Sequence, residues 1–460
     1  MDTHTFTRRI PVDAGYDVCV LGGGPAGAAA AIAAGRLGAR VLLVEGTGCL
    51  GGMGTSGLVT AFDPMANGAE MLVGGIMRQI VETLHREGEL GPGMSPEIFA
   101  KGYMRWTPFR VEGYKRVLDR LATAAGVEVR FFTRLCDAEA DSGAGRVEGV
   151  VLNNVEGWRM VRAATFIDAT GDAVLAAAAG AACREAGRDS PRIMPATMAS
   201  LFAGPVDWRR CTWQAQQDGL KRALADGFFT QPDRHLPGLS VVGDSLGYLN
   251  GGHLFDLNAL RCRDLSAGAM LGRRLAKEYL EFFKRYVPGC EQLEHATTAS
   301  LLGIRESRRI VGEYELNVQD YLARRHFPDQ IGLFNKFIDI HPYDCSDAEW
   351  ARFRAEKDEP RWKLGPGESF GIPYGVLVPR GWKNLWVAGR CVSSDLQVHG
   401  VIRVQPTAAM MGQAAGTAAV QALRHGQTAC DLDTAALVAS LRDQGANLPQ
   451  AVLARTATRS

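Results

Sequence analysis

Residues 16–57 read YDVCVLGGGPAGAAAAIAAGRLGARVLLVEGTGCLGGMGTSG, and this stretch decides the fold. It opens with a short apolar run, Tyr16 to Leu21, which predicts a buried parallel strand. The spacing G-x-G-x-x-G follows, formed by Gly22, Gly24 and Gly27. Pro25, a residue suited to the first turn of a helix, then leads into a run of alanines. Strand, glycine turn and helix in this order are typical of a dinucleotide-binding fold.

Each glycine has a separate physical role in such a turn. Gly22 permits the tight turn, Gly24 lets a pyrophosphate approach the backbone, and Gly27 lets helix and strand pack closely. The free N–H groups and partial positive charge of the helix N-terminus suit the pyrophosphate anion. Pro25 and Ala26 lie at this N-terminus, so we expect them in the same site.

A second apolar run, Val41 to Val44, ends in Glu45. This glutamate follows the motif at about 20 residues, the distance at which an acid meets the ribose hydroxyls. Its charge would repel a 2′-phosphate. In a chain with 54 glycines, some matches to the motif arise by chance. The strand before it, the helix after it and the acid beyond favour a dinucleotide site over a glycine-rich packing turn.

Length, composition and charge are those of an ordinary globular protein. The chain has 460 residues, enough for two or three domains, with 46% hydrophobic and 22% charged residues. The net charge of +1 indicates neither a nucleic-acid partner nor an acidic membrane surface. No run of about 20 apolar residues is present, and the polar start of the chain does not resemble a signal peptide. We therefore expect a cytoplasmic protein that binds a small-molecule substrate, and the sequence leaves open whether it forms a homo-oligomer.

The ten cysteines and nine histidines are scattered along the chain. The cysteines form no C-x-x-C pair, and no histidine lies within four residues of another. This spacing predicts no structural zinc site, and we expect no metal. Most cysteines fall in apolar runs and are interpreted as small core residues, a usage that fits a reducing compartment.

Further along the chain, other segments repeat or extend the first pattern. Glycines follow Glu45 in residues 48–57, where a nicotinamide-binding dehydrogenase usually continues into a helix, and they predict backbone laid closely against a ligand. Buried strands are predicted again at residues 165–168, before the turn ATGD, and at residues 384–389. Residues 341–368 are polar and contain proline, which predicts a surface excursion. Residues 405–423 predict a helix of small residues able to pack closely against sheet and cofactor.

Four stretches resemble the flavin-dependent oxidoreductases of the glutathione-reductase structural type, in particular the broad group of FAD-dependent oxidoreductases. The stretches are GGGPAGAAAAIAAGRLGARVLLVE with LGGMGTSGLV, FIDATGDAVLAAAAGA, GIRESRRIVGEY and NLWVAGRCVSSDLQVHGVIRVQPTAAMMGQAAGTAA, in the family's order. The resemblance implies an α/β fold whose Rossmann-like FAD-binding domain, with a three-layer sheet, is interrupted by an inserted mixed α+β substrate domain. It divides the chain into a lead-in (1–15), an FAD-binding domain (16–190 and 370–430, with 58–110 able to reach into the substrate domain), a substrate domain (191–369), and a C-terminal helix and tail (431–460).

The resemblance also implies which residues hold FAD. The three glycines of the motif would hold the pyrophosphate, and Glu45 the adenosine ribose. Further contacts would come from Gly51, Gly52, Leu135, Gly171, Asp172, Gly389 and Arg390. Many related flavoproteins have aspartate where this chain has Arg390, and Asp395 is a candidate to replace it at the ribityl chain. Arg403 and the start of the last helix would stabilise negative charge on the reduced flavin.

Three side chains are candidates for contact with the substrate. His399, in DLQVHGVIRV, precedes the flavin-facing helix and is a candidate proton donor or acceptor, the alternative being a hydrogen bond to a loop carbonyl. His253 lies on a predicted strand that could form the floor of the pocket. Arg305, Arg308 and Arg309 could each bind a substrate carboxylate through a bidentate guanidinium, or pair internally with Glu306 and Glu313 at helical spacing. We expect internal pairing for two of them and take Arg305 as the candidate site residue.

Two features of related enzymes are missing from the sequence. Only Cys49 lies near the glycine loop, so dithiol chemistry is not indicated, and Gly143-Ala144-Gly145 is explained by a turn rather than by a second nucleotide fold. We therefore expect an FAD-dependent dehydrogenase or oxidase that takes a hydride from a small organic substrate and passes electrons to oxygen or another acceptor. The alternatives are a flavin monooxygenase and a protein with structural FAD that acts in a larger assembly.

Overall fold

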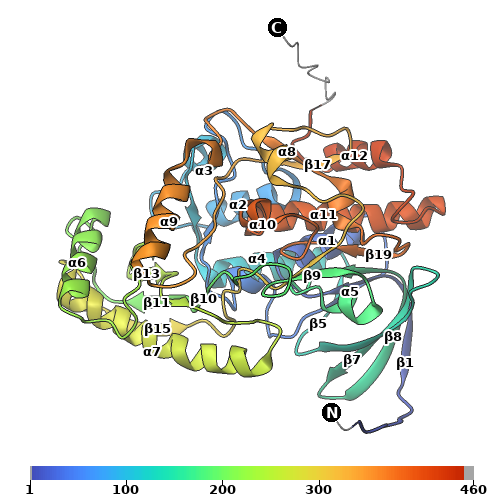
Figure 1. Cartoon of the computed structure of the whole chain (residues 1–460). Helices are drawn as coiled ribbons and strands as arrows, with labels where there is room; N and C mark the ends of the chain where they lie inside the picture. Colours follow the sequence, from blue (N-terminus) through green and yellow to red (C-terminus); the bar gives the residue numbers. More distant parts are fainter. Residues whose placement is uncertain (1–2, 450–460) are drawn as a thin grey trace.

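The main sheet of the computed structural model, which describes residues 3–449, has seven strands (Figure 1). They are β1 (Val12–Leu21), β2 (Val41–Val44), β5 (Glu128–Arg130), β6 (Arg134–Asp141), β7 (Arg146–Asn154), β8 (Gly157–Asp168) and β19 (Leu385–Val387). Their order is β5-β2-β1-β8-β7-β6, with β19 also beside β8. β5, β2, β1, β8 and β19 run parallel, whereas β6, β7 and β8 pair antiparallel.

Strand β8 changes its neighbour along its length. Its first half pairs with β7, from Gly157 opposite Asn154 to Val161 opposite Val150. Its second half, Phe166 to Asp168, pairs with β19. A strand from near the other end of the chain thereby completes the parallel part of the sheet.

The carboxyl ends of the parallel strands share one edge of the sheet. β1 ends before Gly22, β2 before Glu45, β8 before Ala169 and β19 before Ala388. Ligands of open parallel sheets bind outside this edge. The glycine turns recognised in the sequence therefore meet in one place.

Both faces of β1 are buried. Val18 and Val20 pack with the alanines of helix α1 (Pro25–Arg36). Cys19 and Leu21 pack on the opposite side, with residues of β7, β8 and helix α5 (Val174–Ala179). Because successive side chains of a strand point to opposite faces, a continuous apolar run is what a strand covered on both sides requires.

Helix α11 (Gln405–His425) lies directly against α1. Gly412 and Gly416 of α11 face the backbone of Ala26 and Ala30 of α1, and a Cβ at either glycine would overlap the carbonyl oxygen opposite. The close packing predicted from the small residues of this helix is confirmed for its contact with α1.

A second region holds an antiparallel sheet of order β12-β13-β11-β15 with two long helices (Figure 1). Its elements are β11 (Ser200–Ala203), α6 (Trp213–Ala225), β12 (Ser240–Gly243), β13 (Leu246–Leu249), α7 (Cys262–Tyr286) and β15 (Glu294–Thr298). Phe202, Tyr279, Phe282 and Phe283 form the centre of a core between this sheet and the helices.

The other strands pair in short two-stranded sheets: β3 (Ala61–Phe62) with β4 (Thr107–Pro108), β9 (Cys183–Glu185) with β16 (Arg308–Ile310), β10 (Ala196–Thr197) with β14 (His253–Leu254), and β17 (Gln330–Phe334) with β18 (Phe370–Pro373). The other helices are α2 (Gly75–Arg86), α3 (Pro96–Lys101), α4 (Val111–Ala124), α8 (Val318–Leu322), α9 (Asp347–Asp358), α10 (Leu396–Ile402) and α12 (Thr434–Asp443).

Two sequence predictions need correction here. β1 begins at Val12, so the first strand starts before the apolar run that indicates it. The segment around Arg305 carries strand β16 rather than a helix, yet one of the expected internal pairs forms, between Nη1 of Arg309 and Oε1 of Glu306 at 3.2 Å. The end of the C-terminal tail, residues 450–460, lies outside the described residues.

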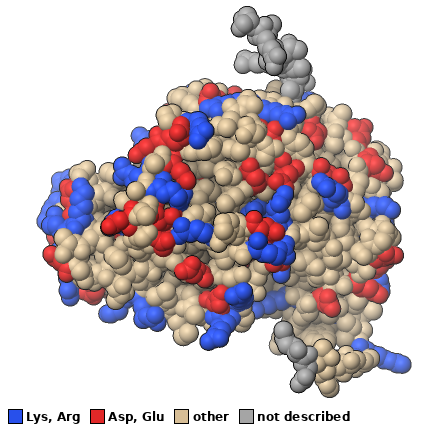
Figure 2. Space-filling view, viewed as in Figure 1, with Lys and Arg blue, Asp and Glu red and all other residues tan. Residues whose placement is uncertain are grey.

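The chain thus has a mixed α/β fold built on a sheet of parallel strands. Acidic and basic side chains alternate over the face shown in Figure 2, in keeping with the near-zero net charge. Within residues 3–449, no helix combines the length and the apolar character needed to cross a membrane.

The contact between α1 and α11 can be tested by adding one methyl group. We expect Gly412→Ala to lower the free energy of unfolding by about 1–3 kcal/mol, because overpacking of a close contact usually costs this much. At Gly143, in the exposed turn between β6 and β7, a Cβ would meet only Oδ1 of the exposed Asp141 side chain, at 3.3 Å, and this side chain can shift. Gly143→Ala should therefore change stability by less than about 0.5 kcal/mol. Urea unfolding followed by circular dichroism measures both, and equal stabilities would contradict the close packing.

Candidate functional site

A large cavity opens at the carboxyl edge of the parallel strands, with a volume of about 1340 Å³. It extends from the glycine turn after β1 to residues of the second region such as Asn250 and Leu301. Pockets for one drug-sized ligand usually enclose about 300–1,000 Å³. This cavity therefore has room for a dinucleotide together with a smaller molecule.

One end of the cavity is the G-x-G-x-x-G turn. Gly22, Gly24, Pro25 and Ala26 line it. Gly22 has a φ of +95°, a conformation that favours glycine. A Cβ at Gly24 would meet no atom within 4 Å, so the backbone here borders open space. Gly27 is not in the lining, and a Cβ there would overlap the carbonyl of Gly22, which makes its role the close approach of helix and turn.

Glu45 follows β2 and lies in the cavity wall, with 8% of its surface exposed. Its Oε2 accepts a hydrogen bond from the N–H of Gly23 at 2.7 Å, and its Oε1 accepts one from the N–H of Thr47 at 2.7 Å. These bonds fix the carboxylate. Each oxygen can accept more than one hydrogen bond, so the group keeps acceptor capacity for hydroxyls in the cavity.

The wall continues with Gly52, Met53 and Leu135. Leu135 comes from β6, while Gly52 and Met53 come from the glycine loop after Glu45. Gly51 is not in the lining. Its φ of +100° instead makes the turn that brings its neighbour Gly52 to the cavity.

The turns after β8 and β19 supply the next part of the wall, with Gly171, Asp172, Gly389 and Arg390. Nη2 of Arg390 donates to Oδ1 of Asp172 at 2.7 Å, and its Nη1 donates to Oγ of Ser307 at 3.0 Å. A carboxylate therefore stands at this edge beside the arginine, although it comes from the turn after β8.

Asp395, the candidate replacement at the ribityl chain, is not in the cavity lining. Its oxygens accept hydrogen bonds from the N–H groups of Val398 and Val318, at 2.8 and 2.6 Å. The residue caps helix α10. Its role is structural, and the expectation of a ribityl contact from it is wrong.

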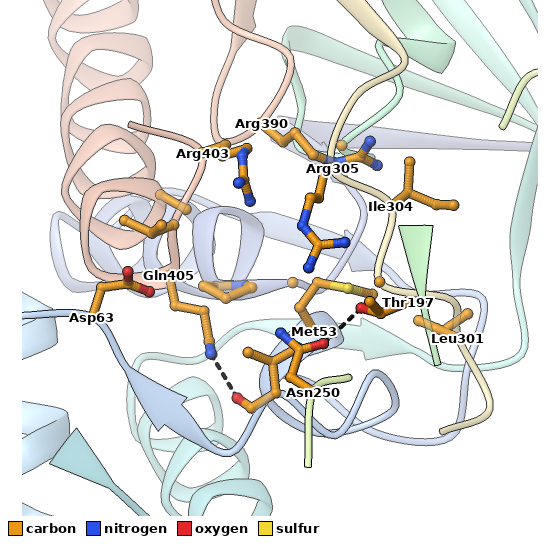
Figure 3. Close-up of a pocket in the computed structure, with 18 of the residues that line it drawn as sticks. Met53, Asp63, Thr197, Asn250, Leu301, Ile304, Arg305, Arg390, Arg403 and Gln405 are labelled. Atoms are coloured by element: carbon orange, nitrogen blue, oxygen red, sulfur yellow. Dashed lines mark hydrogen bonds between the residues drawn. The ribbon is translucent and has the colours of Figure 1, made fainter. Parts of the chain in front are cut away.

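Two arginines face the cavity at its other end. Figure 3 shows the guanidinium groups of Arg305 and Arg403 pointing into the same space, above Met53. Nη2 of Arg403 donates to Oδ2 of Asp339 at 3.1 Å, while its Nε is buried without a hydrogen-bond partner among the described residues. The Oε1 of Gln405 is also buried and unpaired there, but it lies against Gly54, which does not line the cavity. Because buried polar groups are normally paired, the free Nε of Arg403 beside the cavity indicates a contact to a ligand.

Arg305 is 5% exposed. Its Nη1 donates to the carbonyl of Pro195 at 2.7 Å, and no carboxylate of the described residues forms an ion pair with it. Burial and the charge of Arg403 lower the pKa of Arg305 to about 9. Since a buried charge without a counter-ion is costly, this end of the cavity favours an anion.

A polar network forms the wall beside the arginines. Nζ of Lys336 lies 2.9 Å from Oδ2 of Asp339 and 3.4 Å from Oδ1 of Asp63. Burial raises the pKa of Asp63, although Lys336 opposes it. Burial also acts to raise the pKa of Asp339, but Lys336, His341 and Arg403 outweigh it and hold that pKa well below its usual range.

His399 is not in the cavity lining and lies within helix α10, 1% exposed. Its Nε2 donates to the carbonyl oxygen of Arg305 at 2.8 Å. Burial, together with the charges of Arg309 and Arg403, holds its pKa well below the usual value, so the ring is neutral. The structure therefore places His399 behind Arg305, where it fixes the backbone that carries the guanidinium.

His253 is 1% exposed and lies just behind the cavity wall. Its Nε2 is 3.0 Å from Nδ1 of His341, and its ring centroid is 4.9 Å from that of His235. The fold thus gathers three histidines that are far apart in the sequence. Local spacing could not indicate this group.

The ionisation of the cluster follows from its burial. Burial lowers the pKa of His235 to about 3 and holds that of His341 well below its usual range. Burial acts to raise the pKa of Asp233, but the contacts with His253 and His235 outweigh it and lower that pKa to about 2.

Sequence reasoning missed the contribution of residues 341–368. His341, Trp350, Phe353 and Lys357 of this segment line the cavity, although much of the segment is exposed, as expected of a surface excursion. Helix α9 carries three of them to the wall. Its polar side chains suit a polar cavity wall as well as contact with solvent. The sequence IDIHPYD, with acids and a histidine close together, could have indicated that the segment contributes to a site.

Comparison with known proteins gives one extensive match. The model of the FAD-dependent oxidoreductase family matches residues 17–441. No curated protein matches the chain. A geranylgeranyl bacteriochlorophyll reductase-like protein from Thermoplasma acidophilum is 12% identical, with a TM-score of 0.45, over 94% of this chain and 83% of that one.

Two further solved structures are similar to the same degree. The myxobacterial chondrochloren halogenase CndH is 14% identical, with a TM-score of 0.45, over 94% of this chain and 79% of that one. The p-nitrophenol 4-monooxygenase PnpA from Pseudomonas putida is 13% identical, with a TM-score of 0.41, over 94% of this chain and 81% of that one. Because these TM-scores are low, the assignment of the chain to a family depends on the family model alone.

The parallel sheet, the glycine turns and the family match together define an α/β flavoenzyme. The chain belongs to the FAD-dependent oxidoreductase family, and its cofactor is FAD. The residues present fit this cofactor. Gly24 borders open space where a pyrophosphate would lie, and the buried, unpaired Nε belongs to Arg403, which lines the same cavity.

The role of Glu45 can be tested by reversing its charge. We expect Glu45→Arg to weaken FAD binding by about 2 kcal/mol or more, because hydrogen bonds to charged groups are worth roughly 1.5–3 kcal/mol. Glu148→Arg, the same change at an exposed position of β7, should bind FAD like the parent. Flavin retention on gel filtration measures the effect, with circular dichroism to verify folding. If Glu45→Arg keeps its FAD, the carboxylate does not contact the cofactor.

Proposed function

We propose that this protein is an FAD-dependent dehydrogenase or oxidase that oxidises a small organic anion and passes the electrons to oxygen or another acceptor. FAD supplies the hydride-accepting group of this reaction. The chain's own residues bind the anion and orient it. The observation that carries the proposal is the buried guanidinium of Arg305, which faces the cavity without a carboxylate partner among the described residues.

We extend the proposal to the architecture. The main sheet and helices α1 and α11 would be a discontinuous, Rossmann-like FAD-binding domain of the glutathione-reductase type, with a three-layer sheet. Residues 191–369 would contain the inserted substrate domain. Residues such as Leu316, Tyr321 and Phe334 pack in the same cluster as α1 and α11, which supports assigning residues 311–340 to the FAD-binding side of the boundary.

In this proposal FAD lies along the carboxyl edge. The turn at Gly22 and Gly24 would hold the pyrophosphate, Glu45 the adenosine ribose, and Leu135 the adenine. The remaining part of the cofactor would extend past Gly52, Asp172 and Gly389 toward Arg403. All of these residues line one cavity, which supports this placement of the cofactor.

The substrate would lie between the flavin end of the cavity and the second region. Arg305 and Arg403 would bind its negative group, because two guanidinium groups match a carboxylate in charge and geometry. Met53, Leu301 and Ile304 border the same space and would contact its apolar part. His399 would act as a positioning residue, since its ring holds the carbonyl of Arg305.

The cellular setting is part of the same proposal. All ten cysteines are free, and Sγ of Cys211 lies 3.2 Å from Sγ of Cys290 without a disulfide. Most of the cysteines fall in apolar runs of the sequence, a usage that fits a reducing compartment and supports a cytoplasmic location.

The substrate class can be tested with matched compounds. Organic acids should bleach the flavin without oxygen, whereas the corresponding amides, alcohols, amines and sugars should not. With an acid that works, Arg305→Met should raise KM about 10–100-fold, because it removes a charged hydrogen bond worth roughly 1.5–3 kcal/mol. Arg308→Met is the control, since Arg308 pairs with Glu185 at 3.2 Å and is not in the cavity lining. Bleaching by neutral compounds alone, or an unchanged KM in Arg305→Met, would refute the anion site.

A second test separates this proposal from a pyridine-nucleotide-dependent monooxygenase. Outside the main sheet, the strand pairs among residues 3–449 are antiparallel, so they do not repeat the strand, glycine turn and helix of a second dinucleotide site. NADH and NADPH should therefore reduce the flavin far more slowly than the true substrate, although dithionite reduces it fully. Rapid anaerobic bleaching by either nucleotide would favour the monooxygenase.

A further inference from the structure

We propose that His235, His253 and His341 bind one divalent transition-metal ion, such as zinc, in the wall of the cavity. The site does not depend on the substrate proposed above. The three residues come from separate parts of the chain: the loop before β12, strand β14 and the segment after β17. Their convergence is a property of the tertiary structure.

The ring nitrogens have nearly the spacing that a bound ion imposes. One ring nitrogen of each histidine lies within 4.8 Å of one on each of the others. Bonds of about 2.0–2.1 Å from zinc to nitrogen place ligand atoms about 3–4 Å apart. Nε2 of His253 and Nδ1 of His341 are already 3.0 Å apart. A small inward rotation of the third ring would complete the set.

Two carboxylates lie on the outer sides of these rings. Oδ2 of Asp233 lies 3.0 Å from Nδ1 of His253, and Oδ1 of Asp339 lies 3.5 Å from Nε2 of His341. Because a carboxylate only accepts hydrogen bonds, the nitrogen opposite it is the donor of each ring. The remaining nitrogens, Nε2 of His253 and Nδ1 of His341, face each other at 3.0 Å, where one ion can bind both.

The same arrangement is the usual outer shell of a metal-bound histidine, whose second nitrogen donates to a carboxylate. Here it occurs on two of the three histidines. The contact of Asp233 with His253 is not well aligned for a hydrogen bond, and Nδ1 of His253 and Nδ1 of His235 are both buried without a good partner among the described residues. Rotation of the rings toward an ion would let Asp233 align with His253 and give His235 a partner.

Charge balance supports the same assignment. Asp233 is 3% exposed, and no lysine or arginine of the described residues forms an ion pair with it. An ion bound to His253 would place positive charge beside this buried carboxylate, and buried charges are normally paired or bound to metal. His235 and His341 line the cavity whereas His253 does not, so the fourth coordination position would face the cavity and accept water or a ligand oxygen.

The test measures metal in the FAD-loaded protein. We expect about one equivalent of a transition metal per chain by elemental analysis, or its uptake when chelator-treated protein is given Zn²⁺. Co²⁺ should give absorption in the red, where oxidised flavin does not absorb. His235→Gln, His253→Gln and His341→Gln should each lose the ion, and Asp233→Asn should weaken Co²⁺ binding about 10–100-fold, the usual effect of removing an outer-shell partner.

His295→Gln is the matched control, since this partly buried histidine of β15 lies outside the cluster, and it should bind the ion like the parent. Titration of the chelator-treated parent with Co²⁺ does not depend on the folding of any variant. Absence of bound metal and of Co²⁺ absorption in the parent would overturn the proposal and leave a hydrogen-bonded group that shares a proton. Metal that persists in all three histidine variants would place it elsewhere.

Discussion

The parallel pairing of β1 between β2 and β8 is the constraint on which the rest of the structure depends. Because these strands run the same way, every turn that leaves their carboxyl ends opens on the same edge. The turn at Gly22, the acid at Glu45 and the loop at Gly171 meet there although they are far apart in the chain. β19 joins the same edge from near the other terminus and adds Gly389.

Close helix packing is the second condition, since the sheet alone does not fix the position of the last helix. Gly412 and Gly416 bring α11 against the backbone of α1, whose N-terminus borders the cavity. The N-terminal turn of α11 carries Gln405, directly after Arg403 and Val404. The small residues of one helix thereby set where the polar end of the cavity lies relative to the glycine turn.

The opposite ends of the cavity differ in charge for a physical reason. At the glycine turn, backbone N–H groups and Glu45 suit a pyrophosphate and neutral hydroxyls. At the other end, Arg305 and Arg403 are buried near the paired group of Lys336, Asp63 and Asp339. Low-dielectric surroundings strengthen these interactions, so in the proposed function the arginine end would select for an anion while the rest of the cavity would hold the cofactor.

The sequence by itself determined the first strand and helix, the glycine turn, the acid after β2 and the small-residue helix, because each depends on neighbours within a few residues or on local periodicity. It also indicated Arg305 as a candidate for substrate binding, but it did not reveal that this arginine has no carboxylate partner among the described residues. Only the tertiary structure decided that His399 lies behind Arg305, that Asp395 caps a helix, that α9 reaches the cavity and that His235, His253 and His341 converge. These facts depend on contacts between distant segments, and local spacing carries no record of which distant side chains the folded chain brings within a few ångströms.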